Sequence, residues 1–215
     1  MARRSLVLHS GGMDSTVCML IARDQGADVV SLGIDYGQRH RIELQTAARL
    51  CEKFGIPRTV VSINWDKPHR EIPTDRDLEQ IRASVSPAFL PGRNLLFLAI
   101  ASAEAAGIGA DEVWIGINEV DFSGYPDCTS SFLHAFREVI TVAMPDPLLS
   151  IEAPLLNMSK PEIASLAARL GLKQGDTWSC YQPVETPTGM EPCGRCDACV
   201  LHEYAWAQVR DLDTQ

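Results

Sequence analysis

Short apolar stretches rich in β-branched residues alternate with longer stretches in which apolar residues recur every three or four positions. The short stretches predict buried strands, and the longer ones predict helices with one apolar face. The predicted strands are Ser5–His9, Val29–Asp35, Arg58–Ile63, Glu112–Ile117 and Ile151–Leu155. The predicted helices are Ser15–Asp24, Ile42–Phe54, Asn94–Ala106, Ser131–Ala143 and Ser159–Leu170.

The last of these helices carries clear signals at both ends. Ser159-Lys160-Pro161-Glu162 is a capping box with proline in the first turn, and Gly171 follows the final apolar position. Strands that alternate with helices indicate an α/β fold, in which a parallel, Rossmann-like sheet has helices on both faces. Ligands of such sheets bind beyond the carboxyl ends of the strands, so the loops that follow the strands are the first place to look for chemistry.

The pattern changes near Gly175, where Pro, Gly, Thr and Cys replace the alternation of strands and helices. We therefore divide the chain into a main domain, residues 1–174, and a small C-terminal element, residues 175–215, which ends in a short predicted helix at His202–Val209.

Charge and hydropathy exclude several classes of function. The chain has 215 residues, with 19 basic and 28 acidic side chains and a net charge of −9. Without a cluster of basic residues, it is expected to bind neither nucleic acid directly nor an anionic membrane. The basic Arg3-Arg4 pair precedes only a short apolar run, so we expect no signal peptide and a cytoplasmic location.

The loop after the first predicted strand has the composition of a phosphate site. His9-Ser10-Gly11-Gly12-Met13-Asp14-Ser15-Thr16 leaves a strand and opens a helix. Glycines allow close approach of the backbone, and the helix start offers free N–H groups to a pyrophosphate. The loop matches neither the Walker A pattern nor G-x-G-x-x-G. The alternative is an ordinary glycine-rich turn capped by Asp14 or Ser15.

Three further segments follow strands or open helices: residues 35–40, 91–94 and 118–128. Each mixes glycine with polar and aromatic side chains, which suits a flat heterocycle that is stacked and hydrogen-bonded at its edges. Asp121 and Asp127 could accept hydrogen bonds from a guanine-like edge, and Arg39 or Arg93 could pair with phosphate or a carboxylate. Both aspartates could instead be simple turn formers.

Four of the seven cysteines lie close together near the C-terminus. Cys193, Cys196 and Cys199 are spaced by two residues, and Cys180 lies thirteen residues upstream. Four thiolates suit a closed, tetrahedral and therefore structural Zn²⁺ site. An iron–sulfur cluster is the alternative.

These segments together resemble the family of 7-cyano-7-deazaguanine synthases (QueC), a branch of the PP-loop ATP pyrophosphatases. The resemblance covers S-G-G-M-D-S, D-Y-G-Q-R-H, P-G-R-N-L-L-F-L, E-V-D-F-S-G-Y-P-D-C, M-S-K-P-E-I and W-S-C-Y with C-G-R-C-D-A-C. It implies an enzyme that joins ammonia to 7-carboxy-7-deazaguanine using ATP, through an adenylate and an amide, and then dehydrates the amide to the nitrile. It also implies a homodimer and zinc on Cys180, Cys193, Cys196 and Cys199.

The resemblance further implies roles for the residues of the loops. Asp14, Arg93 and Lys160 would be catalytic, with Asp14 contacting Mg²⁺ and the two cations facing the charge of the leaving group. The expected ATP-binding residues are Leu8, His9, Ser10, Gly11, Gly12, Met13, Asp14, Ser15, Thr16, Arg93 and Asn94. The expected binding residues for the deazapurine are Tyr36, Gln38, Arg39, Asn118, Asp121, Tyr125 and Asp127.

Three other functions stay open at this stage. A PP-loop tRNA thiolase would share the first loop, although the net charge disfavours it. A relative could transfer the activated deazapurine acid to a macromolecule rather than to ammonia. A zinc-stabilised nucleotide-binding module would bind without turnover. The spacer between Cys180 and Cys193 is also longer than the family pattern leads us to expect, which leaves the packing of the tail open.

Overall fold

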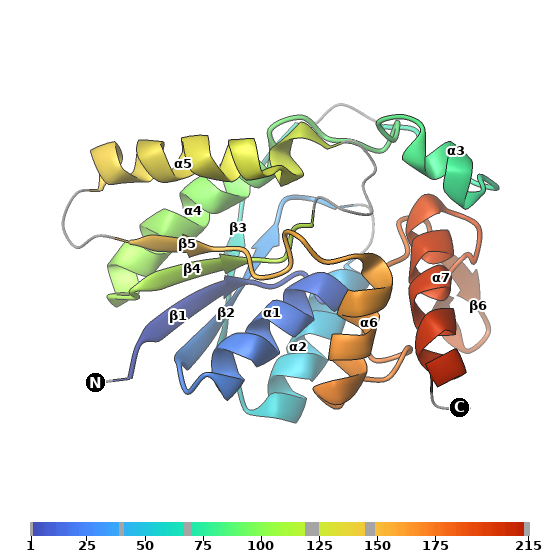
Figure 1. Cartoon of the computed structure of the whole chain (residues 1–215), viewed down its shortest axis with the longest axis horizontal. Helices are drawn as coiled ribbons and strands as arrows, with labels where there is room; N and C mark the ends of the chain where they lie inside the picture. The colour runs from blue at the N-terminus through green and yellow to red at the C-terminus, as the bar shows by residue number, and fades with distance from the viewer. Residues whose placement is uncertain (1, 39–40, 67–69, 119–124, 145–148, 213–215) are drawn as a thin grey trace.

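The computed structural model describes residues 2–38, 41–66, 70–118, 125–144 and 149–212 (Figure 1). A central sheet of five parallel strands has the order β3-β2-β1-β4-β5. Its strands are β1 (Arg4–Leu8), β2 (Asp28–Asp35), β3 (Arg58–Ser62), β4 (Glu112–Ile115) and β5 (Ser150–Glu152). The predicted α/β fold is therefore confirmed.

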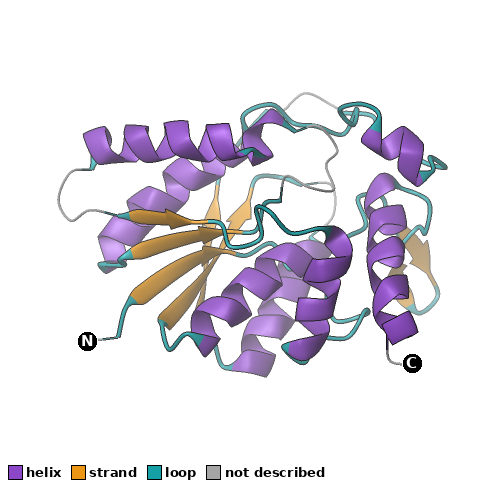
Figure 2. Cartoon of the chain, viewed as in Figure 1, coloured by secondary structure: helices purple, strands orange, loops and turns teal. Residues whose placement is uncertain are grey.

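Helices cover both faces of the sheet, as Figure 2 shows. One face carries α1 (Met13–Asp24), α2 (Ile42–Phe54) and α6 (Lys160–Arg169), with α7 (Asp197–Leu212) packed on α6. The other face carries α4 (Arg93–Ile108) and α5 (Ser130–Ala143). The short elements are α3 (Leu78–Arg82), the 3-10 turn η1 (Pro126–Cys128) and an antiparallel hairpin of β6 (Val184–Thr186) and β7 (Gly189–Glu191).

Each face of the sheet has its own apolar core. Val17, Leu50 and Trp206 are buried in the cluster that joins the sheet to α1, α2, α6 and α7. Leu98 and Phe136 belong to the cluster beneath α4 and α5. Because both faces are buried, the central strands read as continuous apolar runs rather than as alternating patterns.

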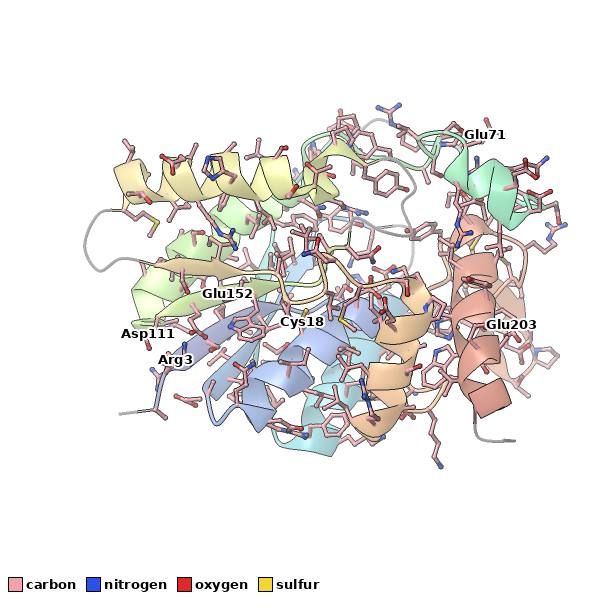
Figure 3. The ribbon with its side chains drawn as sticks, in the orientation of Figure 1. Arg3, Cys18, Glu71, Asp111, Glu152 and Glu203 are labelled. Atoms are coloured by element: carbon pink, nitrogen blue, oxygen red, sulfur yellow. The ribbon has the colours of Figure 1, made fainter. Side chains whose placement is uncertain are left out.

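Cys18 and Cys51 belong to the first of these cores, as their helical positions suggest. Cys18 is fully buried on α1, and its Sγ lies 3.7 Å from the carbonyl oxygen of Ile115. Figure 3 places it inside the molecule, whereas Arg3 and Asp111 lie at the amino ends of their strands, at the edge farther from α7. Chemistry is therefore expected at the opposite, carboxyl edge.

The elements predicted in the first half of the chain are present with bounds that agree to within two residues, but the short helix α3 was not predicted. The last predicted strand is shifted and shortened to Ser150–Glu152, because residues 153–158 turn instead of continuing the sheet. The last helix begins at Asp197 and not at His202, so Cys199 is helical. The long spacer between Cys180 and Cys193 is occupied by the β6–β7 hairpin, which was not predicted.

β1 lies between β2 and β4, so the chain reverses its direction of strand addition at β1. The crevice at such a switch point is where ligands of doubly wound sheets bind. Within the described ranges, no helix has the length and apolar character needed to cross a lipid bilayer.

Candidate active site

A cavity of about 360 Å³ lies at the carboxyl ends of the strands, at the switch between β1 and β4. The loops after β1, β2 and β4, the first turns of α2, α4 and α6, and the C-terminal tail all contribute to its wall. Many residues expected from the sequence line it: Leu8, His9, Ser10, Gly12, Met13, Asp14, Ser15, Tyr36, Gln38, Arg93, Asn94, Asn118, Tyr125 and Lys160.

The hydroxyl groups of the loop after β1 form hydrogen bonds with its own backbone. Gly12 is the N-cap of α1, and no side chain caps this helix. The Gly12 amide donates to Ser10 Oγ at 3.3 Å, and Ser15 Oγ donates to the Gly12 carbonyl at 3.2 Å. The reading of this loop as a turn capped by Asp14 or Ser15 is therefore wrong, and the start of α1 faces the cavity without a side-chain cap.

Two glycines let neighbouring backbone segments touch this loop. Gly11 has a φ of +90°, and a Cβ there would lie 2.5 Å from the Glu43 carbonyl oxygen. A Cβ on Gly116, just after β4, would lie 2.7 Å from the backbone nitrogen of Ser15. The loop is consequently wedged between the first turn of α2 and the end of β4.

A buried hydrogen-bond network supports the loop from behind. His9 Nδ1 lies 3.0 Å from Ser31 Oγ, and its Nε2 lies 3.1 Å from Thr16 Oγ1. Thr16 Oγ1 donates to the Gly12 carbonyl at 2.7 Å, so His9 must supply the proton on Nε2. Burial, with the nearby Arg58 guanidinium, lowers the pKa of His9 to about 3, which keeps the ring neutral.

Thr16 and Gly11 thus take part in building the loop but do not line the cavity. Thr16 is fully buried, and its hydroxyl bonds the Gly12 carbonyl and His9. The Gly11 carbonyl accepts a bond of 2.9 Å from the Trp178 amide, which ties the tail to the loop.

Asp14 and Lys160 form an ion pair at the mouth of the loop. Lys160 Nζ lies 2.5 Å from Asp14 Oδ2, and each side chain is 19% exposed. Asn118 Nδ2 donates to the same oxygen at 3.1 Å. Three segments that are far apart in the sequence, the starts of α1 and α6 and the loop after β4, therefore place polar groups on one point of the cavity wall.

Aromatic side chains and one arginine line the other half of the cavity. The ring of Tyr36 lies 5.1 Å from that of Phe97, and Tyr125 stacks on Phe89 at 4.9 Å. Burial raises the pKa of Tyr36, against the opposing effect of the Arg93 guanidinium beside it. This half of the cavity offers flat apolar faces around a fixed positive charge, which suits an anionic heterocycle.

Asp127 is buried but does not line the cavity. Its Oδ2 accepts from the backbone amide of Asn94 at 3.1 Å, and its carbonyl accepts from Asn94 Nδ2 at 3.0 Å. Asp127 thereby fixes the start of α4, next to Arg93. Arg39 and Asp121, the other two predicted contacts of the deazapurine, lie outside the described residues.

The four tail cysteines come together as their spacing suggests. The Sγ atoms of Cys180, Cys193, Cys196 and Cys199 all lie within 4.8 Å of one another. Backbone amides point at two of them, with Cys193 N at 3.3 Å from Cys180 Sγ and Cys196 N at 3.4 Å from Cys193 Sγ. A tetrahedral Zn²⁺ with bonds of about 2.3 Å places its sulfur ligands about 3.8 Å apart, so the set fits a single four-coordinate ion.

The loop after β3 holds the cysteine knuckle from outside. Thr74 forms a β-bridge with Cys196, and the Asp75 amide donates to the Arg195 carbonyl at 2.9 Å. Arg76 forms an ion pair with Asp197, the first residue of α7, and Ser86 Oγ donates to the same carboxylate at 2.9 Å. This clasp between residues 74–86 and the tail fixes α7 over the cavity.

Several residues that line the cavity were not predicted. Glu43 comes from α2, and the tail contributes Trp178, Tyr181 and His202. For the tail there was a partial signal, since W-S-C-Y contains the predicted metal ligand Cys180. The sequence carried no comparable signal for Glu43, which looks like any acidic residue in the first turn of an amphipathic helix.

Comparison with known proteins links most of the chain to one family. The family model described as "Queuosine biosynthesis protein QueC" matches residues 4–210. "7-cyano-7-deazaguanine synthase 2" of Rhodopseudomonas palustris is 56% identical over 211 residues, covering 98% of this chain and 100% of that protein. "7-cyano-7-deazaguanine synthase" of Solidesulfovibrio magneticus is 37% identical over 98% of this chain and 94% of that protein.

Among solved structures, the U34-tRNA thiolase NcsA from Methanococcus maripaludis, with its [4Fe-4S] cluster, is similar with a TM-score of 0.51. The match covers 99% of this chain and 74% of that one at 14% identity. At that identity the likeness supports the shared fold alone.

Proposed function

The chain belongs to the QueC family of queuosine biosynthesis proteins, and from this premise we propose that it converts 7-carboxy-7-deazaguanine and ammonia to 7-cyano-7-deazaguanine with ATP. The observation that carries the proposal is the 56% identity to a synthase of that name along 98% of this chain. The cavity is consistent with the proposal. Its wall combines the start of α1, which has no side-chain cap, with aromatic side chains that could contact a flat ring.

We assign the phosphates of ATP to the loop after β1. Ser10, Gly12 and Ser15 line the cavity there, and their hydroxyl and amide groups would donate to an anion. Lys160 would stabilise the charge that develops on pyrophosphate as it leaves. Asp14 would hold Mg²⁺, which would neutralise phosphate charge when bound.

We assign the deazapurine to the aromatic half of the cavity. Tyr36 and Tyr125 would contact its faces, and Arg93 would hold its carboxylate until that group is adenylated. Gln38 and Asn118, which also line the cavity, would bond the polar edge of the ring or the ribose. Catalysis would then consist of positioning and electrostatic stabilisation, with ammonia as the nucleophile.

The remaining proposals concern partners and location. Ammonia would enter from solution, the enzyme would work in the cytoplasm as a homodimer, and its net charge of −9 would keep it from binding nucleic acid directly. The cysteine set would hold Zn²⁺ as a structural ion.

A turnover assay tests the function. Purified protein with Mg-ATP, ammonium and 7-carboxy-7-deazaguanine should release AMP and pyrophosphate and form first the amide and then the nitrile, followed by mass spectrometry. Release of AMP without amide or nitrile would instead favour a relative that transfers the activated acid to a macromolecule. No ATP consumption with this acid would refute the proposal.

Metal removal should loosen the tail. We expect the purified protein to contain one zinc ion per chain, and Cys196→Ser to lose it, because a site with three thiolates binds far more weakly. Loss of the metal should expose residues 180–200 to limited proteolysis while the sheet stays folded. Cys128→Ser, a cysteine outside the set, is the matched control and should keep its zinc. Iron in place of zinc, measured by elemental analysis, would contradict the assignment.

A further inference from the structure

Glu43 has a place in the cavity that the proposed roles do not use. It lies in the first turn of α2, and its backbone carbonyl oxygen packs so close to Gly11 that a Cβ on Gly11 would lie only 2.5 Å from it. This contact anchors Glu43 beside the loop assigned to the phosphates. Glu43 also lines the cavity, in the wall of the space in which the adenylate would form.

Among the described residues that line the cavity, Glu43 and Asp14 are the two carboxylates. Asp14 is engaged by Lys160 and Asn118. The Glu43 carboxylate has no hydrogen bond to another described residue, and Glu43 is half-buried in the wall of the cavity. A carboxylate in the wall of a cavity is available to a ligand.

We propose that Glu43 takes the protons released by the reacting nitrogen, an inference that rests on the proposed function. In the first half-reaction, the lone pair of ammonia forms the C–N bond to the carbonyl carbon of the adenylate. The C–O bond to AMP breaks, with its electron pair leaving on the phosphate oxygen. The nitrogen keeps two hydrogens in the amide and gives the third to a carboxylate oxygen of Glu43, which returns it to water.

The second half-reaction has the same need. The amide oxygen displaces pyrophosphate from a second ATP, and the nitrogen loses one proton to give an imidate bound to AMP. The C–O bond then breaks onto AMP, while the last N–H electron pair becomes the third bond between carbon and nitrogen. Two further protons must therefore leave the nitrogen, and the reaction needs a group that accepts protons repeatedly.

The electrostatic surroundings suit this work. Burial raises the pKa of Glu43 to about 7, and the Arg93 guanidinium opposes that rise. A carboxylate with such a pKa is both an effective base and able to release its proton at neutral pH. A carboxylate that only accepted bonds from the guanine-like edge would need to stay ionised, so the environment favours proton transfer over ring recognition.

Other ionisable residues of the cavity wall have pKa values that are shifted away from that of Glu43. Arg93 from α4, Tyr36 from the loop after β2 and Tyr181 from the tail are its electrostatic neighbours, and the pKa of each is raised. Asp14 and Lys160, farther along the wall, are paired with each other. The pKa of His202 is lowered by its burial.

The amide half-reaction tests the inference without interference from the titration of ammonium. The 7-amido-7-deazaguanine intermediate and Mg-ATP are mixed with wild type, Glu43→Gln and Glu43→Asp, and pyrophosphate and nitrile are followed separately across pH. In the wild type, nitrile formation should fall as the pH drops below about 7, because Glu43 becomes protonated. In Glu43→Gln this fall at acidic pH (the acidic limb of the pH profile) should disappear, and the rate of nitrile formation should drop by about 10²-fold. Release of pyrophosphate in the first turnover should persist. Glu43→Asp should restore the limb and part of the rate.

Each other outcome counts against the inference. An unchanged nitrile rate and pH profile in Glu43→Gln would refute it. A raised KM for the amide, with pyrophosphate release weakened and the acidic limb retained, would assign Glu43 to ring recognition instead. Wild type that consumes no ATP with either the acid or the amide would remove the proposed function, and this inference with it. Glu52→Gln, exposed on the same helix, is the matched control and should behave as wild type, and circular dichroism should confirm that all variants fold.

Discussion

Replacing Lys160 by methionine should lower kcat for pyrophosphate release by about 10²- to 10³-fold, the usual loss when a donor to developing charge is removed. Lys160 Nζ lies 2.5 Å from Asp14 Oδ2 beside the loop after β1, which we propose to bind the phosphates and call the phosphate loop, and both side chains are only 19% exposed. Because water screens the positive charge of Lys160 only weakly at this site, that charge should act strongly on the leaving pyrophosphate. The long apolar methionine preserves the packing of the lysine stem.

The matched control is Lys53→Met. Lys53 also pairs with an aspartate, Asp176, at 2.9 Å, but it lies on the surface away from the cavity and is 46% exposed. This variant should keep wild-type turnover and lose at most about 1 kcal/mol of stability. An unchanged kcat in Lys160→Met, measured by coupled detection of pyrophosphate, would restrict Lys160 to holding Asp14 in place.

Replacing Gly116 by alanine should inactivate the enzyme although no side-chain function is removed. The new Cβ would lie 2.7 Å from the backbone nitrogen of Ser15 and 2.7 Å from the backbone carbon of Asp14. Neither β4 nor α1 can yield easily, because both are buried in the sheet core, so the start of α1 must move. We expect a loss of about 1–3 kcal/mol in the free energy of unfolding, typical of overpacking, and a much larger proportional loss of ATP turnover.

Gly107→Ala provides the comparison. Gly107 lies in the last turn of α4, where an added Cβ would meet nothing within 4 Å. Alanine should therefore raise the free energy of unfolding by up to about 1 kcal/mol and leave turnover unchanged. If thermal denaturation and ATP turnover changed equally little in both variants, the phosphate loop would not depend on its close contact with β4.

The elements with local end signals could be predicted from sequence alone. α6 lies between Ser159 and Leu170 as its capping box and following glycine indicate, and α2 has the predicted bounds because Gly55 ends it. α7 was predicted five residues too short at its start. The start was missed because its first turn carries Cys199, and metal spacing says nothing about whether a ligand is helical.

The candidate site shows the same division between local and long-range information. The loop after β1 could be identified because its glycines and hydroxyls are adjacent in sequence, and Lys160 could be singled out as the residue that opens α6. Its pairing with Asp14, 146 residues away, depends on the order of the strands. Asp127 shows the converse, since its carboxylate was expected in the cavity and instead fixes Asn94 at the start of α4.

The cavity is assembled from both ends of the polypeptide, which sets an order on its biogenesis. The phosphate loop is finished within the first 16 residues, but Trp178, whose amide bonds the Gly11 carbonyl, and Tyr181 and His202 of the wall are synthesised after the whole sheet. Because domains fold as the chain leaves the ribosome, the nascent sheet forms with an incomplete pocket. The cysteine knuckle that holds the tail is completed only after the sheet, so the proposed Zn²⁺ would bind late and would close the pocket as it bound.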